Sequence, residues 1–232
     1  MNKKVKIALL LALAVTGSLW AQTNRDYVAI GDIYLKNGTI VKPENYSKNG
    51  IGVVCYVDET GQHGWITYYK HAAEMAWSTS DYHTTGVRSY RHVRVLGDNS
   101  QSLIKDIDGA SNTAEIVNES DYNATNYPAC AYVKSLVEGE GWYLPSAGQL
   151  SFMYAYMPVL NKSLIKITNA NCIMSTGSDE IAFPNICYWS SNEYDYNYAW
   201  YISEEGALRI ALKSSSANEL TRPIYVRAMR NF

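Results

Sequence analysis

The stretch that decides the fold lies between residues 51 and 69, where the sequence is IGVVCYVDETGQHGWITYY. Residues 51–57 form a nearly continuous apolar run, which is typical of a strand covered on both faces. Residues 58–61 have the composition of a turn. A second strand is expected over residues 65–69. The pattern therefore predicts two strands joined by a short turn.

Further strands are predicted toward both ends of the chain. Before the central stretch, residues 33–41 have the form of a short hairpin around Asn37 and Gly38. Near the other end, apolar residues alternate over 198–202 and again over 208–212, on either side of a turn at Glu205 and Gly206. This period of two predicts an antiparallel hairpin with one face in water. A last strand is expected over residues 224–230.

Two helices are predicted between these groups of strands. The first covers residues 128–137, with Gly139 just beyond its end. The second begins at Ser146, where Gln149 three residues later completes a capping box, and it is expected to end at Pro158. Residues 71–126 show weak periodicity and are expected to form loops with short irregular elements. Strands at both ends and no βαβ rhythm predict an α+β fold, as one domain over residues 22–232.

The composition excludes several classes of protein. The chain has 232 residues, of which 47% are hydrophobic and 18% are charged, with 20 Lys and Arg against 22 Asp and Glu. This balance argues against disorder, against a coiled coil and against nucleic-acid binding by bulk charge. The 20 tyrosines, together with Asn, Ser and Thr, must supply much of the polar surface. Such a surface favours contact through hydrogen bonds and ring faces.

The first 21 residues have the pattern of a cleaved secretory signal peptide. Lys3, Lys4 and Lys6 precede the apolar residues 7–15, and Ala21 ends a plausible cleavage site. The apolar run is shorter than the roughly 20 residues that a membrane helix needs, so no membrane insertion is expected. We expect a soluble product that is exported to the periplasm, to the cell surface or into the medium.

Export places the four cysteines in a compartment where disulfides can form. Four thiols allow three complete pairings, among which the spacing does not choose. Cys55 and Cys130 lie in apolar patterns typical of small buried side chains. Cys172 and Cys187 bracket a polar, irregular stretch and are the candidate disulfide, which would stabilise the fold by roughly 3 kcal/mol.

Four motifs, taken in order, carry a resemblance to a known family. The motifs are GVVCYVDETGQHG at residues 52–64, GWYLPS at residues 141–146, YWSSNEY at residues 188–194 and YVRAMRNF at residues 225–232. Together they resemble the domain of unknown function at the C-terminus of the Lcl collagen-like adhesin, which also occurs in many exported bacterial proteins. The resemblance covers nearly all of the chain beyond residue 21.

The resemblance implies a C-type-lectin-like fold, related at a distance to the formylglycine-generating enzymes. In that fold the two chain ends pair in one antiparallel sheet, two helices flank it, and a second sheet carries long irregular loops that hold the binding surface. Two departures matter. No cysteine follows Cys187, which argues against formylglycine-generating activity, and the Glu-Pro-Asn, Gln-Pro-Asp and Trp-Asn-Asp tripeptides of calcium-dependent lectins are absent.

The richest candidate binding site is a segment in which carboxylates and amides alternate with phenol rings. Tyrosine offers a large contact area with few rotatable bonds, and Asn, Asp and Glu can bond sugar hydroxyls, so the segment suits glycan or protein recognition. The alternative is a polar hairpin tip with tyrosines packed along the sheet. The candidate ligand-binding residues are Asn192, Glu193, Tyr194, Asp195, Tyr196 and Asn197.

A calcium site is a weaker interpretation of the same segment. Glu193 and Asp195 supply hard oxygen ligands, but calcium prefers six to eight oxygens. The stretch Asp106-Ile107-Asp108-Gly109 is only a fragment of a calcium-binding loop. We therefore expect no resident cofactor, with calcium as the alternative.

A second candidate surface is cationic. Arg88, Arg91 and Arg94 alternate with apolar residues and could bind sulfated or carboxylated glycans. The alternative is a strand or loop whose basic face is only solvated.

No sequence motif for catalysis is present. The nucleophile elbow, the zinc-protease motif, the phosphate loop and the dinucleotide fingerprint are all missing. A triad assembled from distant residues would give no such signal. We expect a non-enzymatic, exported binding or adhesion module for a glycan or a surface protein. The alternative is a structural subunit of a surface or pilus-like assembly; the oligomeric state is not predicted.

The signal peptide gives the first testable prediction. Because cleavage after Ala21 removes the basic and apolar segments, the exported protein should begin at Gln22. N-terminal sequencing of the exported protein measures this directly. A sequence that begins at Met1 would refute cleavage.

Overall fold

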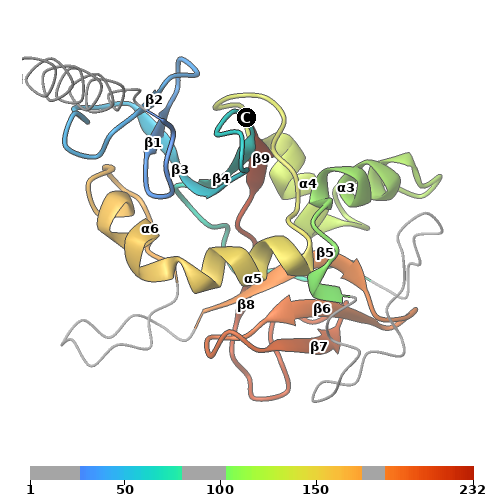
Figure 1. The fold of residues 1–232 in the computed structure, drawn as a ribbon. Coiled ribbons are helices and arrows are strands. Elements are labelled where there is room, and N and C mark those ends of the chain that lie inside the picture. The colour runs from blue at the N-terminus through green and yellow to red at the C-terminus, as the bar shows by residue number, and fades with distance from the viewer. Residues whose placement is uncertain (1–26, 80–102, 174–185) are drawn as a thin grey trace, which may run out of the picture.

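The computed structural model describes residues 27–79, 103–173 and 186–232, and it shows two β-sheets with helices packed against them (Figure 1). The fold is α+β, as predicted from the strand and helix patterns. One hydrophobic core extends through both sheets and the helices. No helix in the described ranges is long and apolar enough to cross a membrane.

The first sheet is antiparallel and has the strand order β2-β1-β3-β4-β9. The predicted hairpin around Gly38 is present, because β1 and β2 pair Ile33 with Val41, and Gly38 has a φ of 89° that favours glycine. The central strand β3 is buried over most of its length, as the apolar run predicted. The bounds are β1 Ile33–Leu35, β2 Ile40–Val41, β3 Gly50–Val57, β4 Gly64–Tyr68 and β9 Met229–Asn231.

The second sheet has the order β7-β6-β5-β8, and only β8 runs parallel to its neighbour β5. The predicted β6–β7 hairpin is present, and Trp200 pairs with Ile210. The prediction that one face of this hairpin is exposed to solvent is wrong for β6, because Trp200 and Tyr201, which point to opposite faces, are both buried. The helix α5 packs against this strand and contributes to its cover. The bounds are β5 Cys187–Glu193, β6 Tyr198–Ile202, β7 Leu208–Leu212 and β8 Ile224–Tyr225.

Four helices are described, where the sequence predicted two. The predicted capping box is present at Ser146, whose hydroxyl accepts from the Gln149 backbone N–H. The prediction that Pro158 ends a helix is wrong. This residue lies in the first turn of α6, where its missing N–H is not needed. In Figure 1, α5 and α6 follow each other across the molecule. The bounds are α3 Gly109–Asn118, α4 Pro128–Ser135, α5 Ala147–Ala155 and α6 Met157–Leu164.

The helix α3 replaces part of the predicted loop region. Its sequence, GASNTAEIVN, is polar and gives little helical periodicity. The carboxylate of Asp108 caps its first turn by accepting from the Ser111 backbone N–H. Thr113 and Ile116 are its buried anchors, and Thr113 Oγ1 accepts from the Leu144 N–H at 2.9 Å. Tertiary contacts therefore stabilise a helix that the sequence pattern does not show.

The predicted last strand is two short strands in different sheets. The chain leaves the second sheet after β8 and enters the first sheet as β9, which pairs with β4 on one side. On its other side, Met229 forms a bridge with Tyr143 of the GWYLPS motif. The C-terminal strand and the N-terminal hairpin therefore belong to one sheet, as the resemblance implied, but the expected pairing of the chain ends is wrong, because β3 and β4 lie between them.

A buried arginine holds the crossing between the sheets. Arg227, which is 0% exposed, lies between β8 and β9. Its guanidinium donates to the carbonyl of Tyr68 at 2.9 Å and to the carbonyls of Asn171 and Cys172 at 2.8 and 3.2 Å. It also donates to the hydroxyl of Tyr188 on β5 at 3.3 Å. One side chain thus joins both sheets and the segment after α6.

Burial and the same cation together lower the pKa of a nearby histidine. His71 Nδ1 lies 3.1 Å from the Tyr188 hydroxyl. Burial, and secondly the charge of Arg227, lower the pKa of His71 to about 3. His71 is therefore neutral in the folded protein at physiological pH.

Replacing Arg227 tests this connection. In Arg227→Met one buried and two partly buried carbonyls lose their donor, so the free energy of unfolding should fall by about 3 kcal/mol or more. The matched control is Arg230→Met, because Arg230 is only partly buried and lies over the rings of Tyr34 and Trp142; its loss should be about 1 kcal/mol. Urea denaturation measures both values, and equal losses would contradict the role of Arg227.

Candidate functional site

The first residue of the predicted binding segment, Asn192, is buried and structural. Its Oδ1 accepts from the Ala147 N–H at the start of α5, at 2.8 Å, and its Nδ2 donates to Asp106 Oδ2 at 2.5 Å. Asp106 also accepts from the Asn112 side chain on α3. Asn192 therefore ties β5 to two helices and is not available to a ligand, contrary to the prediction.

Glu193 is also buried, because it forms an ion pair with Lys213. The Lys213 Nζ lies 2.9 Å from Glu193 Oε1, and the two side chains are 1% and 0% exposed. The ammonium group is also 5.0 Å from the centre of the Trp77 ring. The prediction of Glu193 as a ligand-binding residue is therefore wrong, and a calcium site formed with Asp195 loses one of its two carboxylates.

The remaining four residues of the segment form a tight, partly exposed loop. Asp195 Oδ1 accepts from the backbone N–H groups of Asn197 and Tyr198 at 2.8 and 2.9 Å, which fixes the turn. Tyr194 is half-buried against the rings of Tyr198 and Trp200. Tyr196, 54% exposed, and Asn197 are the residues of the loop that face solvent most. Both interpretations of the segment therefore stay open: the exposed tip has side chains suited to recognition, and the tyrosine before it packs along the sheet.

The loop lies beside the end of strand β7. The Lys213 N–H donates to the Asn197 carbonyl at 2.8 Å, and Tyr198 pairs with Leu212, which is 48% exposed. We call Tyr196, Asn197 and Leu212 the sheet-end surface. It combines a phenol, an amide and an aliphatic side chain.

Strand β7 is an edge of the second sheet. The bonds from the Ser203 N–H to Ala207 and from the Lys213 N–H to Asn197 flank the β6–β7 ladder. Because the pattern alternates, Leu208 and Ile210 direct their backbone N–H and C=O groups away from β6. No second strand pairs with β7 in the ranges that the structure describes. Sequence reasoning found this strand but not its edge position, for which no local signal exists.

The other predicted sites have different outcomes. Arg88, Arg91 and Arg94 lie outside the described residues. The predicted disulfide is not formed, because Cys172 and Cys187 are free thiols, and Cys187 Sγ lies 3.4 Å from Glu204 Oε2. Burial raises the pKa of the Cys187 thiol to about 11. In the part of the chain that is described, no group of three or more His, Cys, Asp or Glu side chains could hold a metal.

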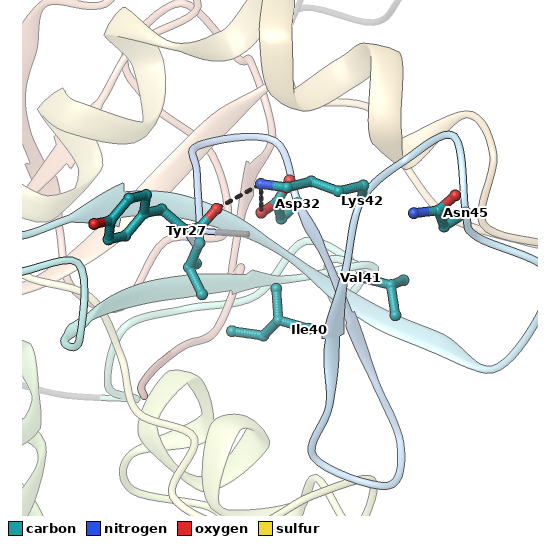
Figure 2. A pocket seen from close by; sticks show the side chains of 7 residues that line it. Tyr27, Asp32, Ile40, Val41, Lys42 and Asn45 are labelled. Atoms are coloured by element: carbon teal, nitrogen blue, oxygen red, sulfur yellow. Dashed lines mark hydrogen bonds and ion pairs between the residues drawn. The ribbon is translucent and has the colours of Figure 1, made fainter. Parts of the chain in front are cut away.

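A small pocket lies beside the N-terminal hairpin (Figure 2). Its volume is about 220 Å³, and Ile40 and Val41 form part of its wall. Lys42 Nζ donates to Asp32 at 2.8 Å and to the Tyr27 carbonyl at 2.6 Å, as the dashed lines in Figure 2 show. These bonds anchor the chain where it enters the first sheet. The lysine charge is balanced by the Asp32 carboxylate, so the pocket does not attract an anion strongly.

The comparisons with known proteins show a fold and no family. No family model and no curated protein matches the chain, so the resemblance to the Lcl domain stays a prediction. Among solved structures, the chain is similar to a fimbrial protein from Bacteroides ovatus, with 18% identity and a TM-score of 0.57. The match covers 88% of this chain and 49% of that one. The chain therefore spans about half the length of that protein, and the likeness shows the fold alone.

The buried ion pair can be tested by paired substitutions. Lys213→Met leaves Glu193 charged and buried, so the free energy of unfolding should fall by about 3 to 5 kcal/mol. Adding Glu193→Leu should restore most of this loss, because no charge then stays buried. The exposed pair between Arg209 and Glu205, with atoms 3.5 Å apart, is the control, and Arg209→Met should cost less than about 1 kcal/mol. A double variant no more stable than Lys213→Met alone would be inconsistent with a structural pair.

Proposed function

We propose that this chain is an exported component of a surface assembly of the fimbrial kind. The observation that carries the proposal is the fold likeness to a fimbrial protein over 88% of this chain. Since the chain spans about half of that protein, the proposed role is that of one module in an assembly. The sequence pattern of an export signal supports the same compartment.

The geometry of the second sheet supports contact between subunits. An open edge strand offers backbone donors and acceptors to another chain, and natural proteins usually protect such edges with charges. Within β7 the one charged side chain is Arg209, which pairs with Glu205. The sheet-end surface adds the exposed side chains of Tyr196 and Leu212 beside this edge. Edge and surface together form a continuous contact region.

A second candidate function is recognition of a glycan or a surface protein by the same loop. The observation that favours it is the exposure of Tyr196 and Asn197 on a turn fixed by Asp195. Rigid tyrosine and asparagine side chains suit recognition surfaces. Neither function requires catalysis, and we propose no enzymatic activity.

The assembly role is tested by blocking the edge. Ile210→Pro removes an N–H that β6 does not use, so the hairpin should tolerate it, while an incoming strand loses a donor. The wild-type protein should associate as its concentration rises, and Ile210→Pro should weaken association about tenfold. Sedimentation velocity measures the association, and thermal melting checks that each variant is folded.

The matched control is Ile210→Val, which keeps the backbone N–H and should associate like the wild type. Fractionation of the producing cells adds an independent measurement, since the protein should co-purify with sheared surface appendages. A protein that stays monomeric at all concentrations and is absent from the appendage fraction would rule out the assembly role.

A further inference from the structure

A groove lies at the end of the first sheet, where β3 turns into β4. Its volume is about 480 Å³, larger than the pocket beside the N-terminal hairpin. It is formed by the ends of β3, β4 and β9, the turn at residues 58–63, the loop before α3 and the start of α5. We call it the β3–β4 groove. The side chains that matter for its chemistry are Tyr56, Trp65, Asp58, Asp108 and Asn231.

One wall of the groove is a rigid aromatic cluster. The rings of Tyr56 and Trp65 stack with centroids 4.2 Å apart and planes inclined by 27°. The ring of Phe152 on α5 packs edge-on against both, at 5.3 and 5.6 Å. Ile107, 46% exposed, adds an apolar side chain to the lining. The wall is therefore held in place before any ligand arrives.

A chain of hydrogen bonds fixes the orientation of Asn231 at the groove. Gln149 Oε1 accepts from the backbone N–H groups of Gly109 and Ser146, so Gln149 Nε2 must be the atom that donates to the Tyr143 hydroxyl, at 2.9 Å. Tyr143 then donates its proton to Asn231 Oδ1 at 2.6 Å. Asn231 is exposed, and its Nδ2 makes no hydrogen bond to any described residue. The amide thus presents a donor of fixed orientation.

The remaining polar groups of the groove include both hydrogen-bond donors and hydrogen-bond acceptors. The Tyr56 hydroxyl and the Trp65 indole N–H form no hydrogen bond within the described ranges; Tyr56 is partly exposed, whereas Trp65 is 8% exposed. Asp58 and Asp108 supply carboxylate oxygens. The bond from the Thr60 hydroxyl holds the pKa of Asp58 below its usual value, so this group is charged at neutral pH. No lysine or arginine is among the lining residues that the structure describes.

These features select the chemistry of a ligand. Two carboxylates without a cation disfavour an anionic ligand. An ammonium or guanidinium group has donors only, so it would leave the donors of Asn231, Tyr56 and Trp65 without acceptors. A sugar hydroxyl both donates and accepts, and an apolar sugar face can lie against an aromatic wall. A neutral saccharide satisfies all of these groups.

We propose that the β3–β4 groove binds a neutral saccharide, which packs on Tyr56, supported from behind by the stacked and largely buried ring of Trp65, and bonds Asn231 and Asp108 through its hydroxyls. This site lies on the first sheet, apart from the loop at residues 194–197 and from edge strand β7. The proposal goes beyond a role in surface assembly and does not depend on it.

The test uses isothermal titration of the purified protein with defined probes. The neutral probes are hexasaccharides of glucose, mannose, galactose and xylose. The charged probes are a heparin hexasaccharide and a lysine-rich hexapeptide. At least one neutral probe should bind, and neither charged probe should bind more tightly. Asn231→Asp keeps the acceptor for Tyr143 but replaces the free donor with an anion, so it should weaken neutral binding about fivefold or more.

Two further variants separate binding from folding. Asn37→Asp is the matched control, because Asn37 is exposed in the β1–β2 hairpin and is not among the residues that line the groove. Its Oδ1 also accepts a hydrogen bond, from the Thr39 N–H at 3.1 Å, so the same change should leave sugar binding unchanged. Asp108→Asn retains an N-cap for α3 and should also weaken binding. The proposal is overturned if no neutral probe binds, if Asn231→Asp binds like the wild type, or if a charged probe binds more tightly. Sedimentation of the Ile210 variants is independent of these results, so the two proposals fail separately.

Discussion

The burial of a single cation, Arg227, constrains the rest of the structure. A guanidinium removed from water must find acceptors for its donors, and here backbone carbonyls of β4 and of the segment after α6 supply them, together with Tyr188 of β5. No carboxylate among the described residues hydrogen-bonds to it. The two sheets must therefore meet at this point, and the chain must change sheets between β8 and β9. Burial, and secondly the same charge, lower the pKa of His71 and keep it neutral.

The second sheet is also held by buried polar contacts, as the crossing between the sheets is held by Arg227. Glu193 pairs with Lys213 across the sheet, and Asn192 bonds both Asp106 and the start of α5. These contacts occupy two of the six residues in the segment that has the richest recognition chemistry in the sequence. The groups that stay accessible to a partner or ligand lie at the loop tip around Tyr196, along edge strand β7 and in the β3–β4 groove. A surface assembly and a saccharide site would thus use opposite sheets of one fold.

Of the predicted binding segment, the structure exposes Tyr196 and Asn197 and buries Asn192 and Glu193, and its role in ligand binding stays a prediction. Alternating carboxylates, amides and tyrosines indicated a surface segment, because polar aromatic segments favour surfaces. The sequence could not separate buried Asn192 and Glu193 from exposed Tyr196, since their partners, Ala147 and Lys213, are distant in the chain. The orientation of Asn231 was equally hidden, because it depends on a relay through Tyr143 and Gln149.

The sequence by itself determined the local elements: the strands over the apolar runs, the turn at Gly38, the capping box at Ser146 and hence the α+β class. These follow from periodicity and from bonds between near neighbours in the chain. Only the tertiary structure decided that polar α3 is a helix, that residues 224–231 divide between two sheets and that β7 is an edge. Each of these depends on contacts between residues far apart in the chain, such as those of Arg227, which no local pattern encodes.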